Sequence, residues 1–114
     1  MGKLLVVGSV AFDTVKTPFG EVDDVLGGSA TYFSTAASFF TEVDLIAVVG
    51  EDFPEHHIEF LKSRGIDVSG LERRNGKTFR WKGEYTYQLN EAPTLDTQLN
   101  VLETFHPKIP AHYR

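Results

Sequence analysis

The sequence predicts an α/β fold in which a small, largely antiparallel sheet projects from a parallel core sheet. Two largely apolar runs, Lys3–Val7 and Val43–Val49, are each followed by a glycine and are typical of strands buried on both faces, the first of them central. The helical stretch between them indicates a parallel crossover from strand to helix to strand. Beyond Val68 the chain turns to short β-rich runs, and Asn75-Gly76 between two of them is a hairpin signal.

Length and composition point to one small domain and exclude several functions. With 114 residues, 41% of them hydrophobic, the chain can bury one core but not two. The net charge of -5 argues against nucleic acid as a partner, because phosphate contacts need clustered cations. The absence of cysteine removes disulfides and thiolate chemistry and fits a cytoplasmic protein. The N-terminal apolar run is too short for a secretory signal or a membrane span, so no membrane association is expected.

Two helices are expected in the core. The first spans Ser29–Thr41, and its small residues would permit a close approach to the sheet. The second opens at Pro54 and runs through Arg64, with Asp52 as its N-cap and Gly65 as its C-terminal stop. The side chains expected to form the buried stripe of the first helix are Ala30, Phe33, Ala37 and Phe40.

Further strands are expected to build the projecting sheet. The stretch Thr14–Val25 alternates loosely and carries Pro18 and Gly20 near its middle, which indicates two short exposed strands and a turn. A returning strand is expected near Leu99–Val101, followed by an irregular tail over residues 102–114. The other predicted strands are Leu71–Arg74, Thr78–Trp81 and Glu84–Leu89.

Four segments stand in a fixed order along nearly the whole chain. They are Val7-Gly8-Ser9-Val10-Ala11-Phe12-Asp13, Gly27-Gly28-Ser29-Ala30-Thr31-Tyr32-Phe33, Val48-Val49-Gly50-Glu51-Asp52-Phe53 and Gly65-Ile66-Asp67-Val68-Ser69. Each is weak alone, but the ordered set resembles the N-terminal part of the ribokinase-like (PfkB) family of sugar and nucleoside kinases. The resemblance implies a partial doubly wound, Rossmann-like core whose substrate pocket is covered by a β-sheet lid, with ATP held further along the sequence. Residues 1–114 would form one unit, with 1–13 and 26–67 in the core and 14–25 and 68–101 in the lid.

The candidate substrate site combines Asp13 with Gly27, Gly28 and Ser29 at the start of the first helix. Backbone amides at a helix start beside one carboxylate suit a ligand rich in hydroxyl groups. The resemblance implies that Asp13 binds sugar hydroxyls and that the glycine pair lets the backbone approach the ring. The alternatives are a turn cap at Asp13 and a tight strand-to-helix turn at the glycines. Tyr32 stands near the point where many family members have asparagine.

No catalytic residue is predicted within the chain. The Gly-Ala-Gly-Asp type motif that the family uses for proton abstraction and anion stabilisation is missing, and no complete Walker loop of the form Gly-x-x-x-x-Gly-Lys-Ser/Thr occurs. ATP and Mg²⁺ are implied for the full-length protein, with neither expected on this fragment, which should not transfer phosphate alone. The chain would thus be the substrate-binding and lid portion of an ATP-dependent sugar or nucleoside kinase. A non-catalytic binding or self-assembling module built on the half-fold is the alternative, so enzymatic activity stays open.

Within the lid, Arg80 and Trp81 are the candidate side chains for closing over substrate or meeting a second subunit. Family members often dimerise through this sheet, so the resemblance implies a homo-oligomer. Ordinary cross-strand pairing on an exposed sheet is the alternative. His56-His57 is expected on a solvated helix face and no metal site is predicted, because adjacent histidines of a helix do not chelate together.

Overall fold

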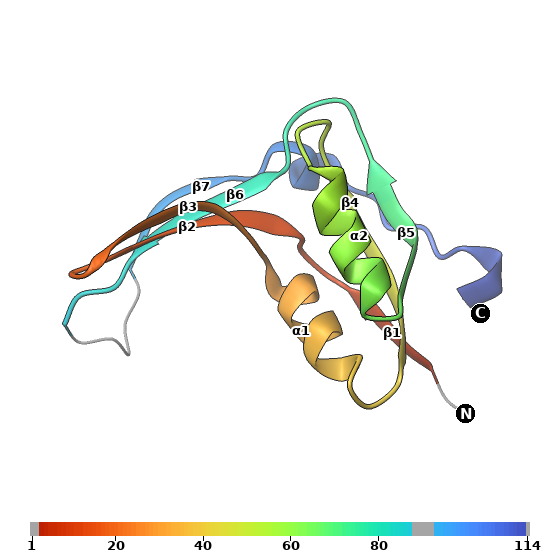
Figure 1. The fold of residues 1–114 in the computed structure, drawn as a ribbon. Coiled ribbons are helices and arrows are strands. Elements are labelled where there is room, and N and C mark those ends of the chain that lie inside the picture. Colours follow the sequence, from red (N-terminus) through yellow and green to blue (C-terminus); the bar gives the residue numbers. More distant parts are fainter. Residues whose placement is uncertain (1–2, 88–92, 114) are drawn as a thin grey trace.

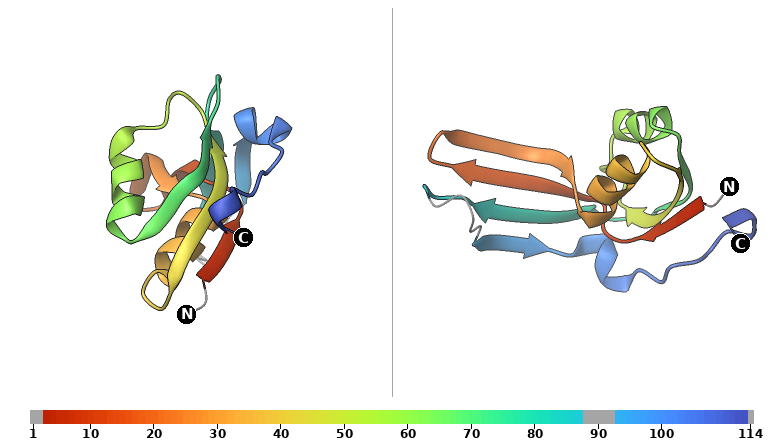
Figure 2. Two further views of the ribbon diagram at one scale, coloured as in Figure 1. Left: turned by 90° about the vertical axis from the view of Figure 1, so that its right-hand side faces the viewer. Right: turned by 90° about the horizontal axis from the view of Figure 1, so that it is seen from below.

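The computed structural model describes residues 3–87 and 93–113, which form two sheets (Figure 1). The core sheet is parallel and three-stranded, in the order β1-β4-β5. Both core helices lie on one face of this sheet, and the C-terminal segment lies on the other (Figure 2). The core elements are β1 (Lys3–Val7), α1 (Ser29–Ala37), β4 (Glu42–Val49), α2 (Glu55–Ser63) and β5 (Ile66–Arg73).

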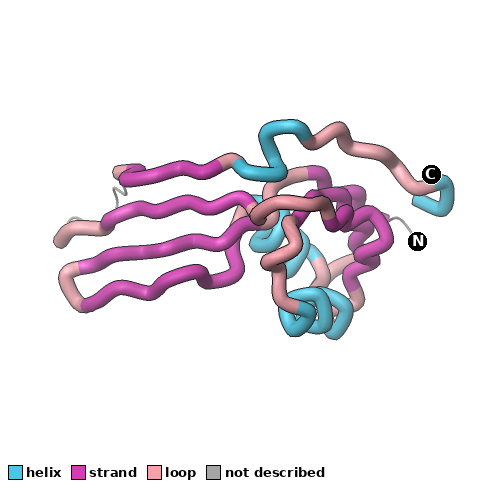
Figure 3. The backbone as a smooth tube through the Cα atoms, turned by 90° about the horizontal axis from the view of Figure 1, so that it is seen from above, coloured by secondary structure: helices cyan, strands magenta, loops and turns pink. Residues whose placement is uncertain are grey.

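The second sheet, which we call the lid, extends away from the core as a long ribbon (Figure 3). Its strand order is β3-β2-β6-β7, with antiparallel pairs at both sides and a parallel β2–β6 pair in the centre. The predicted α/β class, with a parallel core and a projecting, mostly antiparallel sheet, is confirmed. The lid strands are β2 (Ala11–Thr17), β3 (Gly20–Gly27), β6 (Phe79–Glu84) and β7 (Thr94–Gln98), followed by the short 3-10 helices η1 (Asn100–Thr104) and η2 (Ala111–Tyr113).

The two apolar strands of the core differ in burial. β4 is the central strand, and every residue from Val43 to Val49 is buried, as predicted. β1 instead lies at the edge of the described sheet, and Leu5 and Val7 are 42% and 52% exposed. The prediction that β1 is central and covered on both faces is wrong for this part of the chain, because β1 pairs with only one described strand.

Helix α1 buries small side chains rather than the predicted aromatic stripe. Its buried residues are Ala30, Thr31 and Ser34, whereas Phe33 is 55% exposed and Phe40, beyond the end of the helix, is 89% exposed. The helix lies close to β1 and β4, so its contact face has room only for alanine, serine and threonine. The expected close approach is therefore present, and the expected role of the phenylalanines is wrong.

Helix α2 begins and ends near the predicted residues but lacks the predicted cap. Pro54 occupies the N-cap position and no side chain caps the helix. Asp52 accepts hydrogen bonds from the backbone N–H and the hydroxyl of Thr78 instead, so the N-cap prediction for Asp52 is wrong. Gly65 has a φ of 76° just beyond the C-cap, the conformation expected of a glycine that stops a helix.

The predicted hairpin at Asn75-Gly76 is absent from the fold. β5 pairs with β4 in the core sheet, and β6 pairs with β2 in the lid, so the Asn-Gly turn joins two different sheets. Residues 68–73 thus belong to the core sheet, although the sequence placed them in the lid. An Asn-Gly pair specifies a local change of direction but not which sheet the next strand enters.

The returning strand and the tail also differ from the prediction. β7 covers Thr94–Gln98, whereas Asn100, with a φ of 52°, opens η1. The tail ends in η2, whose Tyr113 hydroxyl reaches the core at Gly70 and Leu45. The predicted strand over residues 84–89 extends into a stretch outside the described residues. None of the described helices is long and apolar enough to cross a membrane.

Candidate functional site

Asp13 lies at the base of the lid, and its side chain contacts the glycine pair. A Cβ atom at Gly27 would come within 2.0 Å of Asp13 Oδ2, so only glycine leaves room for this carboxylate. Partial burial raises the pKa of Asp13, and the backbone amide of Gly28 offsets part of that rise. The structure therefore brings Asp13 together with Gly27 and Gly28, while their role in substrate binding stays a prediction.

A β-bulge sets the register that places Gly27 beside Asp13. Beyond the bulge Val15 pairs with Val22, whereas before it Ala11 pairs with Gly27. Asp24, with a φ of 51°, is the extra residue on β3, and its N–H donates to Thr14 Oγ1 at 3.2 Å. Bulges re-aim side chains, because a shift of one residue exchanges the two faces of a strand.

The start of α1 is held by Ser9, which sequence reasoning did not single out. The carbonyl of Ser9 accepts the N–H of Ala30 at 2.9 Å, and its hydroxyl accepts the N–H of Ser29 at 3.0 Å. The hydroxyls of Ser9 and Ser29 lie 3.1 Å apart. Gly28, with a φ of 93°, permits this contact, since a Cβ there would lie 2.5 Å from Ser9 O. The backbone N–H and the hydroxyl of Ser29 thus both contact Ser9 within the strand-to-helix turn.

Arg80 and Trp81 lie on opposite faces of the lid. Trp81 pairs with Asp13 across β2 and β6, and its indole N–H donates to Thr94 Oγ1 at 3.0 Å. Its ring covers Gly83, where a Cβ would collide with the indole at 1.9 Å. Arg80 pairs with Phe12 instead, because neighbouring residues of a strand point in opposite directions. Of the two predicted lid residues, only Trp81 shares the face of Asp13.

Two tyrosines bring further aromatic surface towards Asp13. Burial raises the pKa of Tyr32, and the charges of Asp13 and Tyr85 raise it further, so the three groups are electrostatic neighbours. Tyr32 comes from the first turn of α1, and Tyr85 follows β6 directly. Together with Trp81 they give this part of the chain three aromatic side chains near the Asp13 face of the lid.

Comparison with known proteins relates this architecture to kinases. No family model matches the chain. A cytidine kinase from Thermococcus kodakarensis is 36% identical over 76 residues, which are 66% of this chain and 27% of that protein. Ribokinase from Cryptococcus neoformans, solved with ADP, matches with a TM-score of 0.74 at 21% identity over 88% of this chain. A Burkholderia thailandensis nucleoside kinase, solved with inosine, matches with a TM-score of 0.73 at 12% identity over 89% of this chain.

The chain has a ribokinase-like fold. The resemblance indicated by its four sequence segments is therefore confirmed. The chain covers 35% of the Cryptococcus ribokinase and 37% of the Burkholderia nucleoside kinase, so the likeness concerns about a third of each structure.

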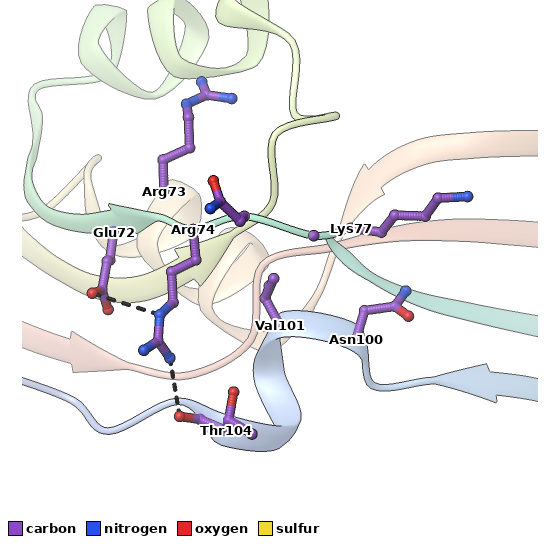
Figure 4. A pocket seen from close by; sticks show the side chains of 9 residues that line it. Glu72, Arg73, Arg74, Lys77, Asn100, Val101 and Thr104 are labelled. Atoms are coloured by element: carbon purple, nitrogen blue, oxygen red, sulfur yellow. Dashed lines mark hydrogen bonds and ion pairs between the residues drawn. The ribbon is translucent and has the colours of Figure 1, made fainter.

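A cavity of about 750 Å³ lies elsewhere in this ribokinase-like chain, at the seam between β5 and η1 (Figure 4). The two arginines that line this cavity already donate hydrogen bonds within the chain, and the lysine side chain points away from them. Arg74 Nη1 donates to Thr104 O at 3.0 Å, and Arg73 Nη1 donates to Phe53 O at 2.8 Å. The Lys77 side chain points away from Arg74 in Figure 4. We therefore assign no ligand to this cavity.

Among residues 3–87 and 93–113, no group of three or more His, Cys, Asp or Glu side chains is arranged to hold a metal ion. His57 packs against the rings of Phe12 and Phe53, with centroids 6.1 and 5.3 Å away, and burial lowers its pKa. His57 is thus a packing residue, and no ATP contact is assigned within this ribokinase-like chain.

Proposed function

We propose that this chain is the substrate-binding and lid portion of an ATP-dependent kinase that phosphorylates a hydroxyl of a nucleoside or sugar. The observation that carries the proposal is the Asp13 carboxylate lying against Gly27 on the lid face that also bears Trp81. The similarity to a cytidine kinase and to a nucleoside kinase solved with inosine supports a nucleoside as the first substrate to test.

The proposed role of Asp13 is to accept hydrogen bonds from two neighbouring hydroxyls of the substrate sugar. An ionised carboxylate has two oxygens and forms short, strong hydrogen bonds with hydroxyl donors. Gly27 and Gly28 present no side chain, so the ring can approach the backbone closely. Trp81, Tyr32 and Tyr85 offer ring faces to the sugar or base on the same side.

ATP and Mg²⁺ belong to the proposal for the complete protein rather than for these residues. The chain contains neither a complete Gly-x-x-x-x-Gly-Lys-Ser/Thr loop nor a Gly-Ala-Gly-Asp type motif, the parts that stabilise a phosphoryl group in transfer. The similarity to a ribokinase solved with ADP supports adenine nucleotide as the phosphoryl donor. We expect residues 1–114 alone to transfer no phosphate, and we place the complete kinase in the cytoplasm.

Replacing Asp13 tests the proposal directly. In the complete kinase, Asp13→Asn should weaken nucleoside or sugar binding by about 10- to 100-fold, since hydrogen bonds to a charged group contribute roughly 1.5–3 kcal/mol. Calorimetric titration of cytidine, inosine and ribose into parent and variant measures the effect. ATP affinity should stay within about twofold of the parent value, because ATP is expected to bind elsewhere.

Asp96→Asn provides the matched control, because Asp96 is an exposed aspartate of the same lid that lies on β7, a strand that pairs with β6 and not with the strands of Asp13 or the glycines. It should leave binding unchanged. Equal losses of nucleoside and ATP affinity in Asp13→Asn would show that Asp13 is structural. A parent protein that binds none of the three compounds and phosphorylates none of them would favour the non-catalytic module.

A further inference from the structure

Arg80 joins three parts of the molecule on the lid face opposite Asp13. It stands on β6, and its guanidinium reaches across β2 to the carboxylate of Asp24 on β3. Its other terminal nitrogen donates to Asp52 Oδ2 at 3.1 Å, in the loop between β4 and α2. The guanidinium carbon lies 4.8 Å from the centroid of the Phe12 ring, over its face. One side chain therefore connects the bulged strand, the central lid strand and the core.

Asp24 matters because it is the bulge residue. If the pairing of Val15 with Val22 continued without a bulge, Asp13 would face Asp24, and Ala11 would face Leu26. A leucine side chain would then occupy the place beside Asp13 that Gly27 leaves open. A positive φ is unfavourable for an aspartate, so the observed register needs contacts that hold Asp24 in place. Those contacts come from Thr14 and Arg80.

Asp52 provides a fixed point in the core. Its Oδ1 accepts the N–H of Thr78 at 2.9 Å and the hydroxyl of Thr78 at 2.7 Å. Thr78 is fully buried, and its hydroxyl also accepts the N–H of Gly50 at 2.9 Å. Burial alone would raise the pKa of Asp52, but the bonds from Thr78 and Arg80 outweigh it and lower the pKa. Arg80 is thus bound to an ionised carboxylate that the core holds rigidly.

We propose that Arg80 is the positioning residue of the candidate site: by tying the Asp24 bulge to Asp52, it fixes the strand register in which Gly27 pairs with Ala11 and leaves room for the Asp13 carboxylate. The expected effect of Arg80 on substrate binding rests on the proposed function. The pairing register of β2 and β3 does not, because it can be measured without a ligand. Arg80 acts from the far face of the sheet and does not contact the substrate. Its effect on binding passes through Asp24 and the bulge.

The test uses Arg80→Gln and Arg80→Lys in the complete protein. Lys82→Gln is the matched control, because Lys82 lies on the same strand and the same face, and its side chain pairs at 3.4 Å with Glu21 rather than with Asp24 or Asp52. The first readout is the cross-strand backbone NOE between Ala11 and Gly27. The second is calorimetric affinity for cytidine, inosine, ribose and ATP, with thermal melting to verify folding.

Arg80→Gln should abolish the Ala11–Gly27 NOE and weaken substrate affinity on the order of 10- to 100-fold, as small displacements of binding groups do. ATP affinity should not change. Arg80→Lys keeps one ion pair and should restore part of the affinity, and Lys82→Gln should match the parent. If Arg80→Gln melts too low to study, the double variant with Asp24→Gly should recover the NOE, because glycine adopts a positive φ unaided.

Retention of the NOE in Arg80→Gln, with affinities equal to those of Lys82→Gln, would overturn the inference. The parent protein separates this result from failure of the proposed function. If the parent binds no sugar or nucleoside, the proposed function fails, and the NOE still decides whether Arg80 holds the register. If the parent binds and Arg80→Gln loses ATP affinity equally, Arg80 serves only general stability and the inference is wrong.

Discussion

The hydroxyl of Tyr113 shows how single polar groups fasten the C-terminal segment to the core. It accepts the N–H of Gly70 at 3.0 Å and lies 2.9 Å from the Asp67 carboxylate. Burial, with the neighbouring charge of Asp67, raises the pKa of Tyr113 to about 12. Burial by itself would raise the pKa of Asp67 as well, but hydrogen bonds from Ser69 and Tyr113 and the charge of His112 outweigh it and lower that pKa to about 2. The segment is therefore bound through an ionised carboxylate.

The hydrogen bonds between Asp67, Ser69 and Tyr113 make the free energy of unfolding depend on pH. Because the pKa of Asp67 is lower in the folded state than its ordinary 3.8, its contribution is fully present above about pH 4 and is lost as the pH falls towards 2. Denaturant unfolding of the parent and of Asp67→Asn between pH 6 and pH 2 measures it. The stability difference between the two proteins should shrink steadily below about pH 4.

The matched control for this titration is Asp96→Asn, an exposed aspartate of β7 whose carboxylate accepts a local bond from Gln98. Its stability difference from the parent should change little over the same range. A constant difference between parent and Asp67→Asn down to pH 2 would show that the carboxylate is not held in its ionised form.

At the scale of the site, the sequence predicted that Asp13 and the two glycines lie together, and the structure brings them together; their role in binding stays a prediction. The sequence was not sufficient to find the bulge. Asp23 and Asp24 look alike in the sequence and both lie opposite Thr14, and only the backbone conformation shows that Asp24 takes the positive φ. The opposite directions of Arg80 and Trp81 follow from alternation, but the face that meets Asp13 depends on the partner strand.

At the scale of elements, the sequence predicted where strands and helices lie along the chain better than it predicted which strands are central and which helix faces are buried. Apolar runs located β1 and β4, but neither run could show that β4 is central and β1 lies at an edge. Helix α1 was located by its composition, whereas its buried face was misjudged because aromatic residues were assumed to point inward. Small residues of α1 pack against the sheet instead, and the Ser34 side chain is completely buried there.

Ser34 gives a test of this packing. Its buried hydroxyl has no hydrogen-bond partner among the described residues, which is unfavourable. Ser34→Ala removes that group without adding volume and improves helix propensity, so we expect a gain of roughly 0.5–1 kcal/mol in the free energy of unfolding. Ser63→Ala in α2 is the control, because its hydroxyl already donates to Phe60 O at 2.6 Å. Denaturant unfolding that shows Ser34→Ala to be less stable than the parent would reveal a partner for the hydroxyl.

At the scale of the whole molecule, the two sheets present different edges. The outer lid strand β3 carries Glu21, Asp23 and Asp24, and charged side chains discourage pairing with another chain. β1 carries only Lys3 on an otherwise apolar strand, and β4 is its one partner among the described strands. The lid tip adds Phe19, 83% exposed and stacked edge-on against Tyr87. An oligomer through the lid sheet stays a proposal for the complete protein, and the chain of residues 1–114 also exposes the apolar side chains of Leu5 and Val7 on β1.

The two surfaces can be separated by substitution in the chain of residues 1–114. Because β1 combines unpaired backbone groups with exposed Leu5 and Val7, we expect this chain to associate through that edge. Size-exclusion chromatography with light scattering should show oligomers for the parent and for Phe19→Ser. Val7→Lys should shift the chain towards monomer, since a lysine on an edge strand opposes pairing. If Phe19→Ser alone yields monomers while Val7→Lys stays oligomeric, the lid tip is the contact in the isolated chain as well.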